Sequence, residues 1–337
     1  MKKLFLFALF AALCCSCTES GTDENTDPNG GSNSGQTTPP DPDSDAKDVI
    51  HVPKGGMLAG ILNELGLKSP SSLKLSGTLG VSDFTTLRNI QSLEHLDISR
   101  VNLSVLPTEA FLECTNIKSV ILPNTLTAIG TQAFWGSSLV SISIPASVEE
   151  IRGSAFFGCS SLKTVTFEKG SKLKTVAGFS HCTSLTTIEI PASVETIGQY
   201  AFNDCTSLHT VTFEKGSKLK TIGSDVFLNC TSLTMIEIPA SVETIEDQAF
   251  EGCSLLATVT FEKGSQLKTV DGFSNCTALT TVDMSACTQV TRIEYRAFYE
   301  DSKLQLFKIG TRTPPSCGRN VFTGINSYSV LKVPAGC

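Results

Sequence analysis

The stretch CTSLTTIEIPASVETIGQYAF (residues 182–202) returns almost unchanged as CTSLTMIEIPASVETIEDQAF (residues 230–250), and the related CTSLHTVTFEKGSKLKTI (residues 205–222) lies between them. A unit of about two dozen residues is too small to bury its own apolar face, so it must stack on its neighbours. The repetition therefore predicts a solenoid, in which successive coils of the chain stack along one axis.

The pattern L-x-x-L-x-L, with apolar residues at its three fixed positions, can be followed through eleven units. The first copy is Leu93, Leu96 and Ile98, and a looser last copy starts at Tyr328. Alternate side chains of a strand face opposite sides, so the fixed residues are expected to point inward and the x residues outward. The segment after each strand, such as residues 194–205, has a spacing closer to a short irregular or helical turn than to a second sheet.

Two types of unit alternate along the chain. One type carries IPASV, as in residues 190–194, and the other carries FEKGS, as in residues 167–171. The longer turn of the FEKGS type is balanced by a shorter segment before the next phenylalanine, which keeps the coil length nearly constant. The unit that starts at Leu208 takes the long form of both segments, and we expect a small outward bulge at residues 223–225.

These units resemble the BspA-like leucine-rich repeat, which reads AF-x-x-C-x-S-L-x-x-I-x-I-P-x-S-V-x-x-I, over roughly residues 90–335. The resemblance implies an α/β solenoid with a parallel β-sheet on the concave face and short turns or irregular segments on the convex face. It further implies a secreted bacterial protein displayed on the cell surface, where the studied role is adhesion to host or neighbouring-cell proteins. The family pattern brings no catalytic residues.

Residues 1–17 have the form of a lipoprotein signal peptide. Two lysines precede an apolar run, residues 4–13, that is too short to span a bilayer as a stable helix. Ser16 before Cys17 resembles a bacterial lipoprotein cleavage site, so Cys17 is the expected lipid anchor and Cys15 is an alternative. Ordinary signal cleavage without a lipid is the remaining alternative.

Residues 18–48 are the expected linker. They contain no apolar residue larger than alanine and cannot offset the entropy cost of ordering, which predicts disorder. Acidic residues soon after Cys17 also resemble the sorting signals of surface-exposed lipoproteins in Gram-negative bacteria. The expected location is therefore the outer membrane, with the protein facing outward.

The part of the chain expected to fold carries almost no net charge. The whole chain has a formal net charge of −7, and residues 1–48 hold eight acidic residues and three lysines. The remainder therefore carries −7 − (−5) = −2. Because DNA binding depends on a strong basic field, nucleic acid is not an expected partner.

Residues 49–92 do not fit the repeat and are interpreted as an N-terminal cap, because an open solenoid end would pair with other chains. The apolar spacing predicts a helix in GGMLAGILNELG (residues 55–66), a strand at LKLSG (residues 73–77) and a second helix in VSDFTTLRNI (residues 81–90). Residues 93–337 are the expected solenoid with a C-terminal cap. Either its final rung is expected to be poorly covered, or the sequence is a truncated copy.

Seven of the 13 cysteines occupy one position of the unit, three residues before the first strand residue: Cys114, Cys159, Cys182, Cys205, Cys230, Cys253 and Cys276. We interpret them as an inward column of free thiols, with Ser137 and Asp301 close to its gaps. Neighbouring coils are near enough for disulfides, which stay an alternative, whereas the absence of C-x-x-C spacing disfavours a metal. Cys287, Cys317 and Cys337 lie outside the column and could form one disulfide.

The outward face of the sheet is the candidate binding face. Eleven strands about 4.8 Å apart would give a surface roughly 50 Å long, which is large enough for a standard protein interface. Threonine is also a favourable strand residue, so its abundance there has a purely structural explanation as well. The candidate residues are Thr164, Thr166, Thr187, Glu189, His209, Thr210, Thr212, Met235, Glu237, Thr258, Thr260 and Thr281.

Nothing in the sequence indicates an enzyme, a metal site or a cofactor. His181 adjoins Cys182, but the cysteine is expected to point inward, and no phosphate-binding glycine loop, G-x-S-x-G or H-E-x-x-H motif is present. We therefore expect a surface protein that binds extracellular or host proteins. The alternative is a glycan-capturing or structural envelope protein with no specific adhesive partner, although one tryptophan and four tyrosines offer few aromatic platforms.

Overall fold

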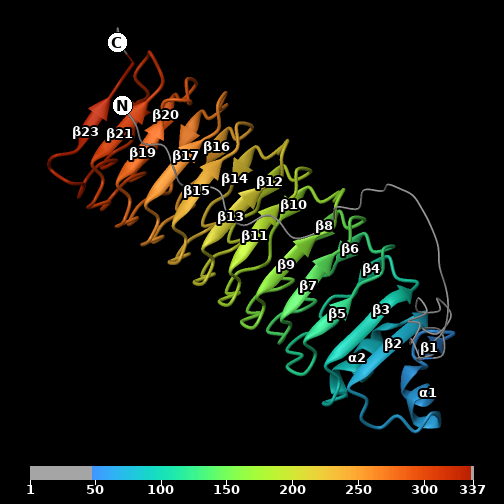
Figure 1. The fold of residues 1–337 in the computed structure, drawn as a ribbon. Coiled ribbons are helices and arrows are strands. Elements are labelled where there is room, and N and C mark those ends of the chain that lie inside the picture. Colours follow the sequence, from blue (N-terminus) through green and yellow to red (C-terminus); the bar gives the residue numbers. More distant parts are fainter. Residues whose placement is uncertain (1–47, 335–337) are drawn as a thin grey trace, which may run out of the picture. The chain divides into compact units, whose positions relative to one another are not determined.

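The described part of the chain, residues 48–334 of the computed structural model, is a parallel β-solenoid whose strands stack in sequence order (Figure 1). The expected signal peptide with Cys15 and Cys17, nearly all of the expected linker, and Cys337 lie outside the described residues. The division into a cap before residue 93 and a solenoid after it stays a prediction.

The first two coils contain the two α-helices. Their elements are β1 (Val49–Val52) and α1 (Leu58–Glu64), then β2 (Ser72–Gly77) and α2 (Val81–Asn89). The two predicted helices and the predicted strand are confirmed, whereas β1, which pairs in parallel with β2, was not predicted. The buried carboxylate of Asp83 in α2 accepts N–H groups from the turn before α1, which holds the two helices together.

One strand per coil continues the sheet that β1 and β2 begin. These long strands are β3 (His95–Val101), β5 (Ser119–Ile121), β7 (Ser141–Ile144), β9 (Thr164–Phe167), β11 (Thr187–Ile190), β13 (Thr210–Phe213), β15 (Met235–Ile238), β17 (Thr258–Phe261), β19 (Thr281–Met284), β21 (Leu306–Ile309) and β23 (Val330–Lys332). They coincide with the eleven units of the predicted pattern. The sheet runs unbroken from β1 to β13 and resumes from β15 to β23.

Each coil from β3 to β21 also contributes a two-residue strand to a second set of parallel sheets. These short strands are β4 (Val105–Leu106), β6 (Ala128–Ile129), β8 (Glu150–Ile151), β10 (Thr175–Val176), β12 (Thr196–Ile197), β14 (Thr221–Ile222), β16 (Thr244–Ile245), β18 (Thr269–Val270), β20 (Arg292–Ile293) and β22 (Ser316–Cys317). The expectation of turns in place of a second sheet was wrong. Both helices precede the repeats, and the described coils from β3 onward contain none, so β-solenoid describes the fold better than α/β.

The core lies between the two sets of strands. Inward residues of the long strands are buried along almost the whole stack, as the alternation predicts, while Phe167 and Phe213 are only partly buried. The last rung differs, because Tyr328 is 87 % and Leu331 62 % exposed. The expectation of a poorly covered final rung is thereby confirmed.

The two unit types produce an alternation in strand pairing. Each IPASV strand pairs through four residues with the FEKGS strand after it, as β11 does with β13. Each FEKGS strand pairs poorly with the IPASV strand that follows: β9 and β11 share one residue pair, and β13 and β15 belong to separate sheets. The proline after each IPASV strand lacks the N–H that the equivalent glutamate donates, as Glu214 does to the Ile190 carbonyl at 2.9 Å.

The expectation of an outward bulge at residues 223–225 was wrong. Gly223 and Asp225 are buried, and a Cβ atom at Gly223 would lie 2.8 Å from the Ile197 carbonyl oxygen of the preceding coil. Glycine therefore lets the longer segment pack closely on its neighbour. The irregularity of this coil lies instead in the long-strand sheet, at the gap between β13 and β15.

Candidate binding surface

The outward side chains of the long strands form two parallel columns. In β9, Val165 is buried and Thr164 and Thr166 on either side of it are exposed. Parallel pairing in register then aligns equivalent residues of successive strands, as Ser141 with Thr164 and Ser143 with Thr166. We call these the first and second outward columns.

The structure places eleven of the twelve candidate residues in these columns. The first outward column holds Thr164, Thr187, Thr210, Met235, Thr258 and Thr281, and the second holds Thr166, Glu189, Thr212, Glu237 and Thr260. His209 is exposed but lies one residue before β13, outside the strand. Thr210, Thr260 and Thr281 are half-buried, and the other candidates are exposed.

The gap between β13 and β15 divides the candidate residues into two groups. Thr212 is on one side of the gap, and Met235 and Glu237 are on the other. Met235 is 58 % exposed, which makes it the most prominent apolar side chain among the candidates. The candidate binding face is therefore interrupted near its middle, where β13 and β15 are not paired.

Both columns continue beyond the residues that the sequence singled out. Ile121 in the second column is 57 % exposed, and Val330 in the first is 50 % exposed. Asp283 and Lys308 form an ion pair of 2.5 Å across the second column. The same alternation of inward and outward residues could have identified these positions.

The cysteine column is buried, and each thiol is free. Cys114 is 3 % exposed and the other six column cysteines are 0 % exposed. Six of the thiols donate to a phenylalanine carbonyl of the preceding coil, as Cys205 does to Phe179 at 3.2 Å. Burial raises the pKa of Cys205 and Cys253 to about 12, so these thiols are neutral and unreactive while the coil is closed.

The disulfide suggested for the remaining cysteines is not formed within the described residues. Cys287 is buried, Cys317 is exposed, and both are free thiols. Ser137 and Asp301, at 3 % and 0 % exposed, occupy the gaps in the column as expected.

A stack of phenylalanine rings lies beside the cysteine column and was not predicted. Nine rings from Phe111 to Phe298 follow one another with centroid separations of 4.8 to 5.7 Å and nearly parallel planes. Phe84 of α2 closes the stack at its N-terminal end in an edge-on contact. The phenylalanine that recurs at one position of each unit, most often in an AF pair, was the available sequence signal.

The pair His181 and Cys182 has no geometry for catalysis. The thiol of Cys182 is fully buried and donates to the Phe156 carbonyl at 3.2 Å. The imidazole of His181 is on the surface, with Nε2 3.7 Å from an oxygen of Asp204. The two side chains therefore contact different residues and are not placed to act as nucleophile and base.

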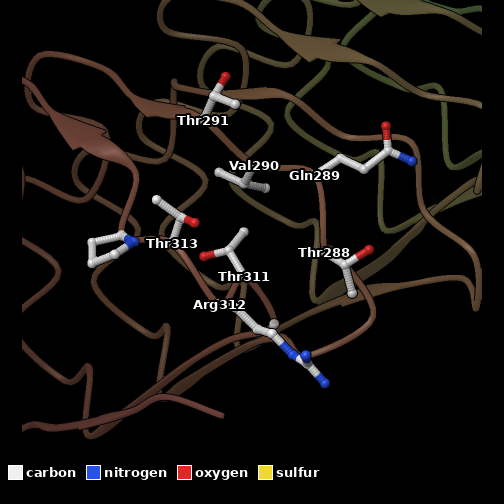
Figure 2. Close-up of a pocket in the computed structure, with 9 residues that line it drawn as sticks. Thr288, Gln289, Val290, Thr291, Thr311, Arg312 and Thr313 are labelled. Atoms are coloured by element: carbon white, nitrogen blue, oxygen red, sulfur yellow. The ribbon is translucent and has the colours of Figure 1, made fainter. Parts of the chain in front are cut away.

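A hollow of about 580 Å³ lies between the turn after β19 and the segment after β21. Residues 288–291 and 310–314 line it, and Figure 2 shows the threonine side chains around Val290 with Arg312 extending away. Arg312 is the one charged residue of this lining. The hollow thus lacks the paired acid and base or activated nucleophile that hydrolytic chemistry requires.

Two further surveys cover residues 48–334 only. No group of three or more histidine, cysteine, aspartate or glutamate side chains in this range is arranged to hold a metal ion. None of its helices combines the length and the apolar character needed to cross a membrane.

Stacked parallel strands around a leucine-type core define this chain as a leucine-rich repeat solenoid. Residues 84–178 and 175–305 match the family model of the BspA type leucine rich repeat region in six copies. The chain belongs to this family. Solenoids of this class are typically non-catalytic binding scaffolds, and no enzyme family is indicated.

Several solved bacterial structures are similar in fold. A leucine-rich repeat protein from Bacteroides ovatus is 21 % identical, with 85 % of this chain and 92 % of that chain covered and a TM-score of 0.44. A leucine rich cell surface protein from Faecalibacterium prausnitzii is 20 % identical, with 79 % and 73 % covered and a TM-score of 0.40. The pneumococcal vaccine antigen PcpA is 20 % identical, with 80 % and 69 % covered and a TM-score of 0.41. Comparison with curated proteins found no match.

Proposed function

We propose that this protein is a non-enzymatic adhesin that binds proteins of a host or of neighbouring cells through the two outward columns. The observation that carries the proposal is the run of exposed or half-buried outward side chains over β9 to β13 and β15 to β19, which is in register within each of the two sheets. Membership of a family built from binding solenoids supports the same reading.

The chemistry of the columns favours a protein partner over a glycan. Threonine hydroxyls and the carboxylates of Glu189 and Glu237 offer hydrogen-bond donors and acceptors, and Met235 offers an exposed apolar contact. Sugar binding commonly uses exposed aromatic rings, and the candidate residues on β9 to β19 contain none apart from the imidazole of His209. Interfaces typically combine such a polar surface with a few apolar anchors.

The experiment is a binding screen of the purified protein against immobilised matrix proteins, intact host cells and a glycan panel. The double variant T212R/T258R places two bulky charges on the outward columns, on either side of the gap. The matched control T206R/T277R makes the same substitutions at exposed threonines outside the strands. We expect the first variant to weaken protein binding at least about tenfold, because buried unpaired charges at an interface cost several kcal/mol, and the control to bind normally.

Three results would contradict adhesion through this face. Equal binding by both variants would place the site elsewhere. Binding to glycans alone would favour a glycan-capturing protein, and binding to nothing in the screen would favour a structural envelope role. Circular dichroism spectra of both variants should match the wild type, since all four positions are exposed.

We also propose that the protein is held at the outer membrane of a Gram-negative bacterium through a lipid on Cys17. The support is the sequence around the expected cleavage site, with Cys15 as the alternative acceptor. Mass spectrometry of the protein isolated from its native cells should find acyl groups on the N-terminal cysteine. An unmodified N-terminal residue would refute the anchor without affecting the binding face.

A further inference from the structure

Three turns on one edge of the solenoid repeat the sequence E-K-G-S. They occupy residues 168–171, 214–217 and 262–265, each directly after a long strand, and we call them the lysine turns. Gly170, Gly216 and Gly264 adopt φ values of 81°, 81° and 83° and face open space, so each turn projects freely into solvent. The three turns therefore have the same shape in alternate coils.

The glutamate of each lysine turn is held against the preceding coil. Oε2 of Glu168, Glu214 and Glu262 accepts the backbone N–H of Ala146, Ala192 and Ala240 at 3.2, 2.9 and 2.9 Å. These contacts fix the carboxylates near the backbone of the IPASV units. The lysine that follows each glutamate is left on the outside of the turn.

Five exposed lysines lie in these turns or directly after them, and none of them forms an ion pair with a described carboxylate: Lys169, Lys172, Lys215, Lys218 and Lys263. They differ from lysines two residues further along each unit, because Lys174 pairs with Glu195, and Lys220 and Lys268 both pair with Glu243, at 2.6 to 2.9 Å. The glutamates of the lysine turns keep their negative charge, although backbone N–H groups fix their carboxylates in place. Counted together, eight lysines and five glutamates lie in and next to the lysine turns, which leaves an excess of three positive charges that the net charge of the domain conceals.

The spacing of the lysine turns determines which anion they fit. Equivalent lysines lie two coils apart, about 10 Å at roughly 4.8 Å per coil, and the three turns span about 20 Å. A compact anion could reach one turn only, whereas an extended chain could contact all three. Duplex DNA carries one charge per about 1.7 Å and is bound by much denser basic surfaces. The pattern suits an extended polymer whose charges are more widely spaced.

We propose that the lysine turns form a second binding edge, for a linear anionic polysaccharide. This edge is separate from the outward columns, so the protein could hold a protein ligand and an acidic glycan at the same time. Binding would be electrostatic and would weaken steeply with salt, because exposed charges are screened beyond about 8 Å at physiological ionic strength.

The test uses heparin as the probe, with the full-length protein, over a series of salt concentrations. The variant K169E/K215E/K263E reverses one lysine in each turn, and K54E/K68E/K303E makes the same change in net charge at exposed lysines away from this edge. We expect the first variant to lose at least about tenfold in affinity for heparin and the second less than about threefold. An exposed pair between a lysine and an anionic group contributes only when the two are in contact, so a change of net charge elsewhere has a small effect. K169Q/K215Q/K263Q, a milder change, should show an intermediate loss.

Four outcomes would overturn the proposal. They are no binding of the wild type to heparin at about 50 mM salt, equal losses in the two reversed variants, no loss in the glutamine variant, and displacement of heparin by duplex DNA at an equal concentration of charge. The variant T212R/T258R should still bind heparin normally. This last measurement keeps the lysine edge distinct from the proposed protein-binding face, so that either can fail without the other.

Discussion

Asp301 is the residue whose surroundings are least suited to its charge. It stands in the cysteine column, is 0 % exposed, and accepts the backbone N–H of Cys276 at 2.8 Å through Oδ1. Its Oδ2 is buried without a hydrogen-bond partner. Burial raises the pKa of this carboxyl to about 8. At neutral pH Asp301 is therefore mainly protonated and behaves like the small neutral thiols of the column.

This position makes stability depend on pH in a defined direction. The folded pKa of about 8 lies above the ordinary value of 3.8, so between these values the folded state holds the extra proton. We expect stability to fall as pH rises from about 4 to 8 and the full penalty to remain above 8. The variant D301N should lose this dependence and be more stable than the wild type at pH 9, by roughly 2 to 5 kcal/mol.

Thermal unfolding of both proteins at several pH values between 5 and 9 measures the difference. Asp271, whose pKa burial raises to about 7, is present in both proteins and contributes equally to each. A wild-type melting temperature that declines no more than that of D301N would contradict the assignment. D301C, which restores the column residue, should behave like D301N.

The sequence predicted single residues well where the unit repeats them. The inward cysteines followed from one position recurring seven times, and Thr164 and Thr166 from strand alternation. The thiol–carbonyl bonds and the stacked phenylalanine rings did not follow, because they depend on the distance between coils and on rotamers that one unit alone does not reveal.

At the level of elements, the proline after each IPASV strand weakens the pairing of that strand with the FEKGS strand before it. The N–H groups of Glu168, Glu214 and Glu262 bond to the preceding strand, and Pro191 and Pro239 cannot do so at the intervening steps. Each IPASV coil is thus bound to the FEKGS coil after it, also through the glutamate of the lysine turn. The alternation of unit types was visible in the sequence, but its effect on pairing required the structure.

We expect the amides of β15 to exchange with solvent faster than those of β17. Both strands lie inside the stack, but β15 has no paired neighbour on its β13 side, whereas β17 is paired with β15 and β19. Unpaired strand amides open with less free energy. Hydrogen exchange followed by mass spectrometry on peptides covering each strand measures this. Equal protection of the two strands would mean that the gap is closed in solution.

The second sheet could not be predicted from the sequence because its strands are only two residues long. The pair Thr196 and Ile197 meets Thr221 and Ile222 through backbone bonds between coils, and a two-residue segment has no periodicity to read. The helices α1 and α2, with seven and nine residues, were long enough for their apolar spacing to identify them.

At the scale of the whole molecule, each coil contacts only its neighbours, so the stability of the stack is close to a sum over coils and interfaces. Because each IPASV coil is bound most closely to the FEKGS coil after it, the repeating unit in this sum is that pair of coils and not the single coil. Removing one pair leaves the same kinds of interface, whereas removing one coil brings two FEKGS coils together. The closing contact between Glu214 and Ala192 is then lost.

We therefore expect a deletion of residues 182–229, one complete pair, to be tolerated better than a deletion of residues 182–204, one IPASV coil. The shorter deletion should lower the midpoint of guanidinium unfolding more, although it removes fewer residues. Circular dichroism during the titration measures both. If the deletion of the pair lowers the unfolding midpoint more, the number of coils affects stability more than the type of coil does.

If the protein is displayed on the cell surface as proposed, the column of reduced thiols has a consequence for how long it lasts there. Outside the cell, thiols are exposed to oxidants, and these thiols are protected only while the coils remain closed. A coil that opens presents cysteines whose neighbours are one coil away, close enough to cross-link into disulfides incompatible with the closed stack. Each opening is then a chance of permanent damage. The lifetime of the protein in oxidising surroundings is then set by the rate of its fastest route of opening, and not by its equilibrium stability.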